Sequence, residues 1–81
     1  MLKSGTVGNK TIVIKGDNVK AITFENGEAH YSGDHSLTGR FFLSDDGTFT
    51  VVEYSSSGRY NSPLFTNGLT TPNGVSIRIT D

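Results

Sequence analysis

The segment VKAITFENGEAHYS, residues 19–32, decides the fold class of this chain. Asn26 and Gly27 lie at its centre, between the runs VKAITFE and EAHYS. Both central residues of a type I′ turn have positive φ angles, which asparagine and glycine tolerate better than other residues. The segment therefore predicts a β-hairpin whose strands occupy residues 19–24 and 28–32.

The rest of the chain repeats this pattern of short β-prone runs separated by turn residues. The other runs are KTIVIK (10–15), RFFLS (40–44), TFTVVEY (48–54) and VSIRIT (75–80). The last of them alternates most regularly and directs Val75, Ile77 and Ile79 to one face. No segment has the period of an amphipathic helix. We therefore expect an all-β fold, a small antiparallel β-sandwich or barrel of about six strands.

The composition supports this fold class and bounds the size of the core. Glycine, serine, threonine and asparagine make up 35 of the 81 residues, whereas alanine occurs twice and glutamate three times. Good helix formers are therefore scarce, and turn and β-branched residues are abundant. We expect one domain, residues 1–81, with a modest core because the chain is short. Cysteine is absent, so association with another surface is the remaining common source of added stability.

Two segments do not fit a simple succession of strands. Residues 1–9 include the stretch KSGTVGN, and we expect them to form a flexible N-terminal arm. Residues 55–74 lack a clear strand and are expected to form a long loop, with a short strand at 63–66 as the alternative. Long loops in compact domains are commonly functional or mobile.

Several predicted strands carry apolar residues on both faces. The run FFL at 41–43 is continuous, and TFTVVEY places Val52 and Tyr54 on the face opposite to Phe49 and Val51. Antiparallel sheets with one solvated face normally alternate more strictly. The pattern therefore favours a second apolar surface outside the core.

Acidic and histidine residues gather at two places in the sequence, but neither group has the pattern of a metal site. Asp45-Asp46-Gly47 lacks the alternating ligands and closing glutamate of an EF-hand loop, so a turn is the favoured interpretation. His30, Asp34 and His35 lie close in sequence, but a closed metal site needs three or four converging ligands. We expect no metal and no cofactor.

The sequence contains no recognisable catalytic motif. No serine lies in a G-x-S-x-G turn, which presents the nucleophile in many hydrolases. Nothing marks an apolar pocket around Glu25, Glu28 or Glu53 that would suit a general acid. Glycines stand at turns rather than in a phosphate-binding loop. An enzyme is therefore the least favoured class, and we expect no catalytic residues.

The long loop and the second face of the TFTVVEY strand hold the strongest candidate for a contact surface. Arginine, aromatic and aliphatic residues of the types enriched at protein interfaces gather there. The candidate interface residues are Arg59, Tyr60, Pro63, Leu64, Phe65, Val52 and Tyr54. The alternative is a lid, in which Leu64, Phe65 and Leu69 fold back over one end of the core.

These features together predict a non-catalytic structural or assembly protein. In its small size and its polar, β-rich composition, the chain is similar to small bacteriophage virion components, and we expect a protein of that kind, such as a capsid decoration or head–tail protein. Such a protein is synthesised in the cytoplasm and assembled into the virion, and its partner is protein, either further copies or a larger shell or tail assembly. The opening residues lack the apolar stretch of a signal peptide, and no run approaches the length of a bilayer span.

Other binding functions remain open. A module for a glycan or a protein partner would use Tyr54, Tyr60 and the loop rich in serine and asparagine. A phage-type protein inhibitor would form a stoichiometric complex with one target enzyme. A single-stranded nucleic acid could stack on Phe41, Phe42 or Phe49. The net charge of −1 and the scattered basic residues disfavour nucleic acid, and we expect neither a nucleic-acid nor a membrane partner.

Overall fold

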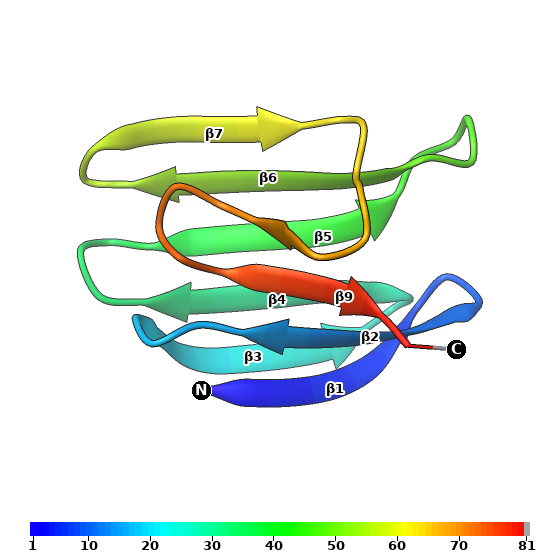
Figure 1. The fold of residues 1–81 in the computed structure, drawn as a ribbon, viewed down its shortest axis with the longest axis horizontal. Helices are drawn as coiled ribbons and strands as arrows, with labels where there is room; N and C mark the ends of the chain where they lie inside the picture. The colour runs from blue at the N-terminus through cyan, green and yellow to red at the C-terminus, as the bar shows by residue number, and fades with distance from the viewer. Residues whose placement is uncertain (81) are drawn as a thin grey trace.

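Residues 1–80, which the computed structural model describes, form β-strands joined by turns. The strands are β1 (Leu2–Val7), β2 (Lys10–Lys15), β3 (Val19–Glu25), β4 (Glu28–Gly33), β5 (Thr38–Leu43), β6 (Phe49–Ser55), β7 (Gly58–Ser62), β8 (Leu69–Thr70) and β9 (Ser76–Ile79). They make a four-stranded antiparallel sheet, β1-β2-β9-β8, and a five-stranded antiparallel sheet, β3-β4-β5-β6-β7 (Figure 1). The predicted all-β antiparallel fold is confirmed as a sandwich-like pair of sheets. No helix capable of crossing a membrane occurs among these residues.

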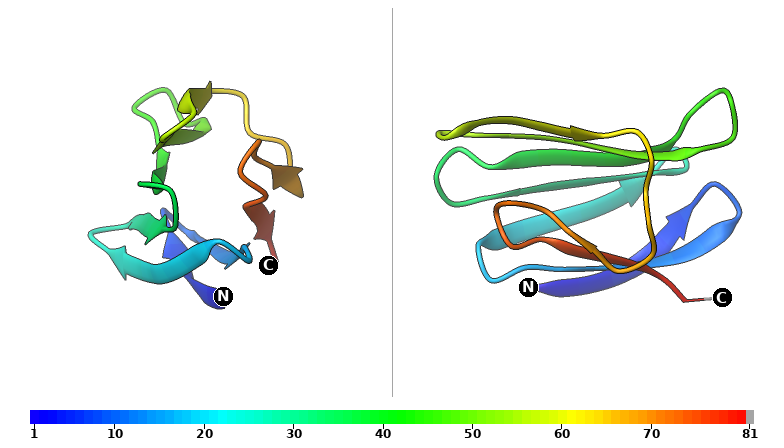
Figure 2. Two further views of the ribbon diagram at one scale, coloured as in Figure 1. Left: turned by 90° about the vertical axis from the view of Figure 1, so that its left-hand side faces the viewer. Right: turned by 45° about the horizontal axis from the view of Figure 1, so that its top comes forward.

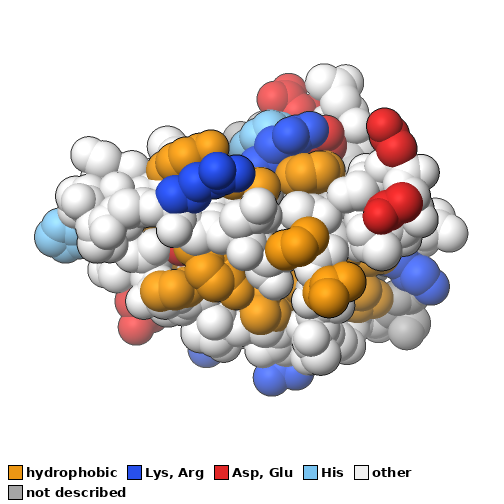
Figure 3. Space-filling view, turned by 90° about the horizontal axis from the view of Figure 1, so that it is seen from above, with side chains coloured by type: hydrophobic (Ala, Val, Ile, Leu, Met, Phe, Trp, Pro, Cys, Tyr) orange, Lys and Arg blue, Asp and Glu red, His pale blue; other side chains and the backbone are white. Residues whose placement is uncertain are grey.

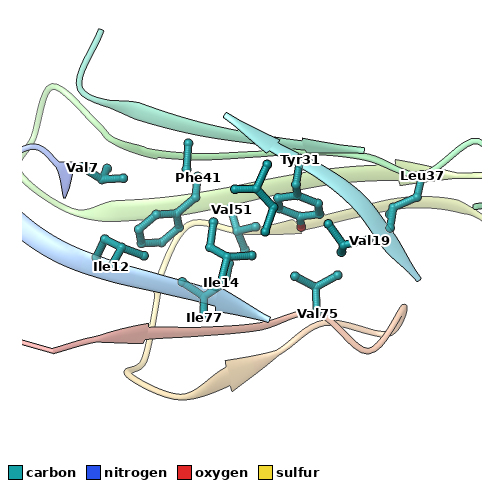
Figure 4. Packing of buried hydrophobic residues seen from close by; sticks show 12 residues of the cluster. Val7, Ile12, Ile14, Val19, Tyr31, Leu37, Phe41, Val51, Val75 and Ile77 are labelled. Atoms are coloured by element: carbon teal, nitrogen blue, oxygen red, sulfur yellow. The ribbon is translucent and has the colours of Figure 1, made fainter. Parts of the chain in front are cut away.

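The two sheets face each other and enclose the core (Figure 2). Strand alternation decides which side chains enter it, because every second residue of a strand points to the same face. Side chains from both sheets point toward one another in Figure 4. The largest fully buried apolar residues are Phe41, Ile12, Ile14, Leu37, Ile77, Val7, Val19, Val51 and Val75. Val75 and Ile77, which the sequence predicted on one face of their strand, are among them, as are the alternating residues Ile12 and Ile14 of β2.

The central hairpin forms as the Asn-Gly pair predicted. Asn26 and Gly27 have φ angles of 53° and 74°, and the strands that they join pair from Glu25 and Glu28 onward. The turn between β1 and β2 contains Gly8, whose backbone N–H donates to the carbonyl of Gly27 at 3.1 Å. The tips of two hairpins, one from each sheet, are therefore joined by a backbone hydrogen bond.

The N-terminal segment differs from the prediction of a flexible arm. Residues 2–7 form β1, which pairs with β2 in continuous register from Leu2 opposite Lys15 to Val7 opposite Lys10. The side chain of Val7 is fully buried, and Gly5 leaves the space that the Phe24 ring occupies. Tertiary contacts therefore order a stretch whose glycine and polar residues predict fraying by themselves.

The long segment 55–74 also differs from the prediction, because it contains β7 and β8. Ser55 faces Gly58 across a two-residue turn, so the chain folds directly back along β6. The strands occupy residues 58–62 and 69–70 rather than the predicted 63–66. The polar composition of this segment hid β7, because a strand at the edge of a sheet needs few apolar side chains.

A polar cluster lies within the core. Glu53 of β6 is fully buried and accepts hydrogen bonds from the hydroxyl of Tyr31 and from the side-chain amide of Asn73, in the turn between β8 and β9. Gly39 of β5 stands between Tyr31 and Glu53 in the sheet register. A Cβ atom at Gly39 would lie 2.0 Å from Cζ of the Tyr31 ring. The absence of a side chain at Gly39 therefore lets the ring of Tyr31 lie across β5 and reach Glu53.

Backbone strain is concentrated in the turn between β4 and β5. His35 and Ser36 both have φ angles of 59°, in the left-handed region that favours glycine. The Leu37 N–H donates to the carbonyl of Asp34 at 3.1 Å, and the Ser56 N–H donates to the carbonyl of His35 at 2.8 Å. These hydrogen bonds, together with the buried Leu37 side chain, hold the strained conformation in place.

Ser36→Gly is expected to raise the free energy of unfolding by about 0.5–1 kcal/mol, because glycine adopts a positive φ without the steric cost of a Cβ atom. Urea denaturation measures the change. Ser56→Gly is the matched control, since the φ of Ser56 is not positive, and it should slightly lower stability. Equal effects of the two substitutions would argue against strain at Ser36.

Candidate functional site

The outer face of the five-stranded sheet carries the candidate site. His30, Arg40 and Val52 lie in one row across β4, β5 and β6, because the register pairs His30 with Arg40 and Arg40 with Val52. The neighbouring row across β5, β6 and β7 consists of Thr38, Tyr54 and Arg59. Successive outward residues of a strand are two positions apart, so both rows share one surface.

A shallow groove of about 430 Å³ lies between and beside these rows. Its lining residues are His30, Thr38, Gly39, Arg40, Val52, Tyr54 and Arg59. A second hollow of about 300 Å³ shares His30, Thr38 and Gly39 with it and extends to Ala21 and Thr23 of β3. Together the two hollows form an open furrow across the sheet, which we call the outer furrow.

Arg40 and its partners form one wall of the outer furrow. The Arg40 guanidinium donates from Nε to Oε1 of Glu28 at 3.0 Å and from Nη2 to Oε2 at 2.6 Å. It also lies 3.9 Å from the centroid of the Phe42 ring, at cation–π distance. Bonding to Arg40, with a further contribution from His30, holds the pKa of Glu28 below its ordinary value. This wall is therefore pre-organised, and the charge of Arg40 is already balanced.

Arg59 and Tyr54 form the opposite wall. The Tyr54 side chain is 50% exposed, and the guanidinium of Arg59 lies 5.8 Å from the centroid of its ring. No carboxylate within residues 1–80 forms an ion pair with Arg59. The positive charge of Arg59 is therefore available to a ligand, next to an accessible aromatic ring.

The free edge of β7 borders the same wall. β7 is the last strand of its sheet and pairs on one side with β6. In the described part of the chain, no backbone hydrogen bond joins its other side to another segment. Figure 3 views the molecule from the side on which β7 lies in Figure 1, and it shows apolar side chains at the surface with basic side chains beside them.

The structure separates the predicted interface residues into two groups. Val52, Tyr54 and Arg59 lie together on the outer face of the sheet, and Pro63 and Leu64 are exposed where the chain leaves β7. Leu64 is 77% exposed.

The other two predicted interface residues, Tyr60 and Phe65, are partly buried and pack against the core. The ring of Phe65 packs edge to face on the ring of Phe41, with 5.0 Å between the ring centroids. The loop therefore combines the two interpretations of its sequence, since Phe65 covers the core as a lid and Leu64 remains accessible.

The predicted interface omitted three polar side chains that line the larger groove of the outer furrow, those of His30, Thr38 and Arg40. The available signal was strand alternation, which directs His30 away from the core when Tyr31 points inward, and Arg40 away when Phe41 points inward. The missing information was the pairing of β4 with β5, which brings these side chains beside β6. The apolar residues on both faces of β6 now have an explanation, because Val52 and Tyr54 line the furrow while Val51 belongs to the core.

The histidine and acidic residues do not converge within the described chain. No group of three or more such side chains among residues 1–80 is placed to hold a metal ion. The Nε2 atom of His30 lies 3.2 Å from Oε1 of Glu28 on the outer face. His35 lies elsewhere, in the β4–β5 turn. Asp34 forms an ion pair with Lys20 at 3.8 Å.

Comparisons of the chain with known protein families, with curated proteins and with solved structures found no match.

Proposed function

We propose that this chain is a non-catalytic assembly protein that associates with further copies of itself through the free edge of β7. The observation that carries the proposal is this unpaired edge, beside the exposed residues Tyr54, Arg59 and Leu64. Unpaired backbone N–H and C=O groups at a sheet edge are a template for pairing with another strand. Edge pairing therefore offers this small domain the additional surface burial that its short chain cannot supply.

The other sheet edges are less suited to pairing. β8 has only two residues. At the edge strand β3, the Lys3 ammonium donates to the carbonyl of Ile22 at 3.0 Å, and Lys20 is exposed nearby. Lysines at an edge strand discourage strand addition. β1 contacts β3 and β4 beside it, which leaves β7 as the most accessible edge.

The residues of β7 suit an antiparallel pairing with the same strand of a second copy. A two-fold axis at Tyr60, the middle residue of β7, places Arg59 of each copy opposite Asn61 of the other. Both residues are exposed and point to the outer face, so the furrows of two copies would share one continuous sheet surface. No like charges stand directly opposite each other in this register.

The specific form of the proposal is a small virion component, such as a capsid decoration or head–tail protein of a bacteriophage. In such a shell, contacts that are individually weak act together over many symmetric copies. The exposed Leu64 would add apolar contact beside the β7 edge.

Opposite charges at Asn61 are expected to change self-association in opposite directions. Asn61→Lys places like charges opposite Arg59 twice in the symmetric interface and should raise the concentration needed for association about tenfold, whereas Asn61→Glu should lower it. Light scattering after size exclusion, over a range of protein concentrations, measures the mass.

Asn61→Thr is the neutral control and should behave like the unmodified chain. The β7 pairing is contradicted if the two charged variants associate equally, and self-association itself is contradicted by a monomer at every concentration.

A further inference from the structure

The outer furrow combines side-chain features that pairing through the backbone edge of β7 does not require, although Arg59 belongs to that strand. The exposed Tyr54 ring and the Arg59 guanidinium, 5.8 Å from its centroid, stand on one wall. Hydroxyl groups of Thr23, Ser32 and Thr38 line the floor toward β3. An accessible aromatic ring, a cation without a carboxylate partner in residues 1–80 and several hydroxyls therefore converge on one open depression.

We infer that the outer furrow binds an acidic oligosaccharide, with one sugar ring stacked on Tyr54 and a sugar carboxylate paired with Arg59. This inference goes beyond the proposed assembly function, because it concerns side chains on the outer face of the sheet rather than the backbone edge of β7. The C–H groups of a sugar ring pack on the face of an aromatic side chain, and its hydroxyls exchange hydrogen bonds with threonine and serine. A guanidinium group pairs with a carboxylate through charge-assisted hydrogen bonds.

The charges of the furrow favour an anionic sugar over a neutral one. Arg40 is balanced by Glu28, with N–O distances of 2.6 and 3.0 Å. Arg59 has no such partner in residues 1–80. Binding a carboxylate would therefore neutralise Arg59 without breaking an existing ion pair.

The position of the furrow favours a sugar over a peptide. Between β4 and β7 the furrow crosses strands whose backbone groups are engaged in the sheet ladder. Extended peptides bind to sheets mainly by adding a strand at an edge, where backbone groups are free. A sugar chain needs side-chain hydroxyls and aromatic faces instead, and the furrow supplies both.

Nucleic acid fits the furrow less well. Single-stranded nucleic acid is bound by several stacking rings along a basic groove. In the described chain the furrow has one half-exposed aromatic ring, that of Tyr54, and its second arginine is paired with Glu28. A single carboxylate matches this arrangement better than a run of phosphates.

The test is a titration of the full chain with short oligogalacturonates. Backbone amide NMR shifts and calorimetry monitor the binding. The protein is kept below the concentration at which its solution mass, measured by light scattering, begins to rise, so that self-association does not contribute. We expect saturable binding with shifts at Thr38, Tyr54 and Arg59. Neutral maltooligosaccharides should bind at least about tenfold more weakly, because they lack the charge-assisted contact.

Substitutions on the furrow wall distinguish the two contacts. Arg59→Gln and Tyr54→Ala should each weaken oligogalacturonate binding about tenfold, whereas Tyr54→Phe should retain it because the stacking face is kept. Lys15→Gln is the matched control for loss of one positive charge, since Lys15 is exposed on β2 of the other sheet, and it should leave the affinity within about twofold.

Three results would overturn the inference. They are the absence of saturable oligogalacturonate binding, equal losses for Arg59→Gln and Lys15→Gln, and binding of oligothymidylate with higher affinity than oligogalacturonate. On the unmodified chain, the titration measures sugar binding below the concentration of association, and light scattering measures self-association without sugar, so either result can be negative without the other. The two proposals therefore fail separately.

Discussion

Tyr31→Phe is expected to lower the free energy of unfolding by about 3 kcal/mol, because it removes a hydrogen bond from a buried carboxyl group and supplies no replacement. Glu53 is fully buried, and its side-chain partners are the hydroxyl of Tyr31 and the amide of Asn73. No buried side-chain nitrogen or oxygen in the described chain lacks a partner. Loss of the Tyr31 hydroxyl therefore weakens a polar cluster that has no spare donor.

Urea denaturation at neutral pH measures this change. Tyr54→Phe is the matched control, because Tyr54 is half exposed on the outer face and its hydroxyl makes no hydrogen bond within residues 1–80. The control should change the unfolding free energy by less than about 0.5 kcal/mol. If both substitutions have the same effect, the hydroxyl of Tyr31 does not support Glu53.

The same variant has an expected signature at alkaline pH. Burial, followed by the hydrogen bond to Glu53, raises the pKa of Tyr31 above its ordinary value of 10.0. The stabilisation that accompanies a raised pKa is fully present below the pKa of the unfolded chain and is lost as the pH rises above it toward the folded value. The unmodified protein should therefore lose stability above about pH 10, and Tyr31→Phe should lose less over the same interval.

Gly39→Ala is the second substitution with a large expected effect, a loss of about 3 kcal/mol. The added Cβ would lie 2.0 to 2.5 Å from three atoms of the Tyr31 ring, a distance that real Cβ atoms do not show. The φ angle of Gly39 is not in the left-handed region, so the steric contact rather than backbone conformation opposes alanine. The ring is buried and hydrogen-bonded to Glu53, and it cannot move aside without breaking that bond.

A double-mutant cycle with Tyr31→Leu tests this cause. Gly39→Ala should cost much less in the Tyr31→Leu background, because the ring that it meets is gone, and the coupling between the substitutions should exceed about 1 kcal/mol. Both backgrounds are measured in trimethylamine N-oxide, which favours the folded state and keeps weakened variants measurable. Additive effects of the two substitutions would show that Gly39 is required for another reason.

The candidate site was predicted in part, and the limit of the prediction lies in strand pairing. Composition and alternation placed Val52 and Tyr54 on a second face of their strand, and the structure has them on the outer face beside Arg59. The same reasoning could not join them to His30 and Arg40, which belong to strands separated from β6 by turns. Side chains become neighbours across a sheet only when the register is set, and the residues of one strand do not specify that register alone.

The buried carboxyl group shows the same limit. Alternation along β6 places Glu53 on the face of Phe49 and Val51, which contribute to the core. The sequence offered no reason for a carboxyl group there, because its partners Tyr31 and Asn73 come from segments far from it in the chain. The order β4-β5-β6 within one sheet brings Tyr31 to Glu53 across Gly39, and the packing of the second sheet adds Asn73.

The amino-acid sequence by itself determined the features that depend on a few adjacent residues. These were the all-β class, the hairpin around Asn26 and Gly27, and the strands whose inner faces form the core. The tertiary structure alone decided that residues 2–7 and 58–62 are strands, because polar residues with weak local preference become strands when a neighbour pairs with their backbone. It also decided the outer furrow and the free edge of β7, because both arise from the order of strands in the sheet. Turn and alternation signals are local, whereas sheet order results from burying distant apolar faces against each other.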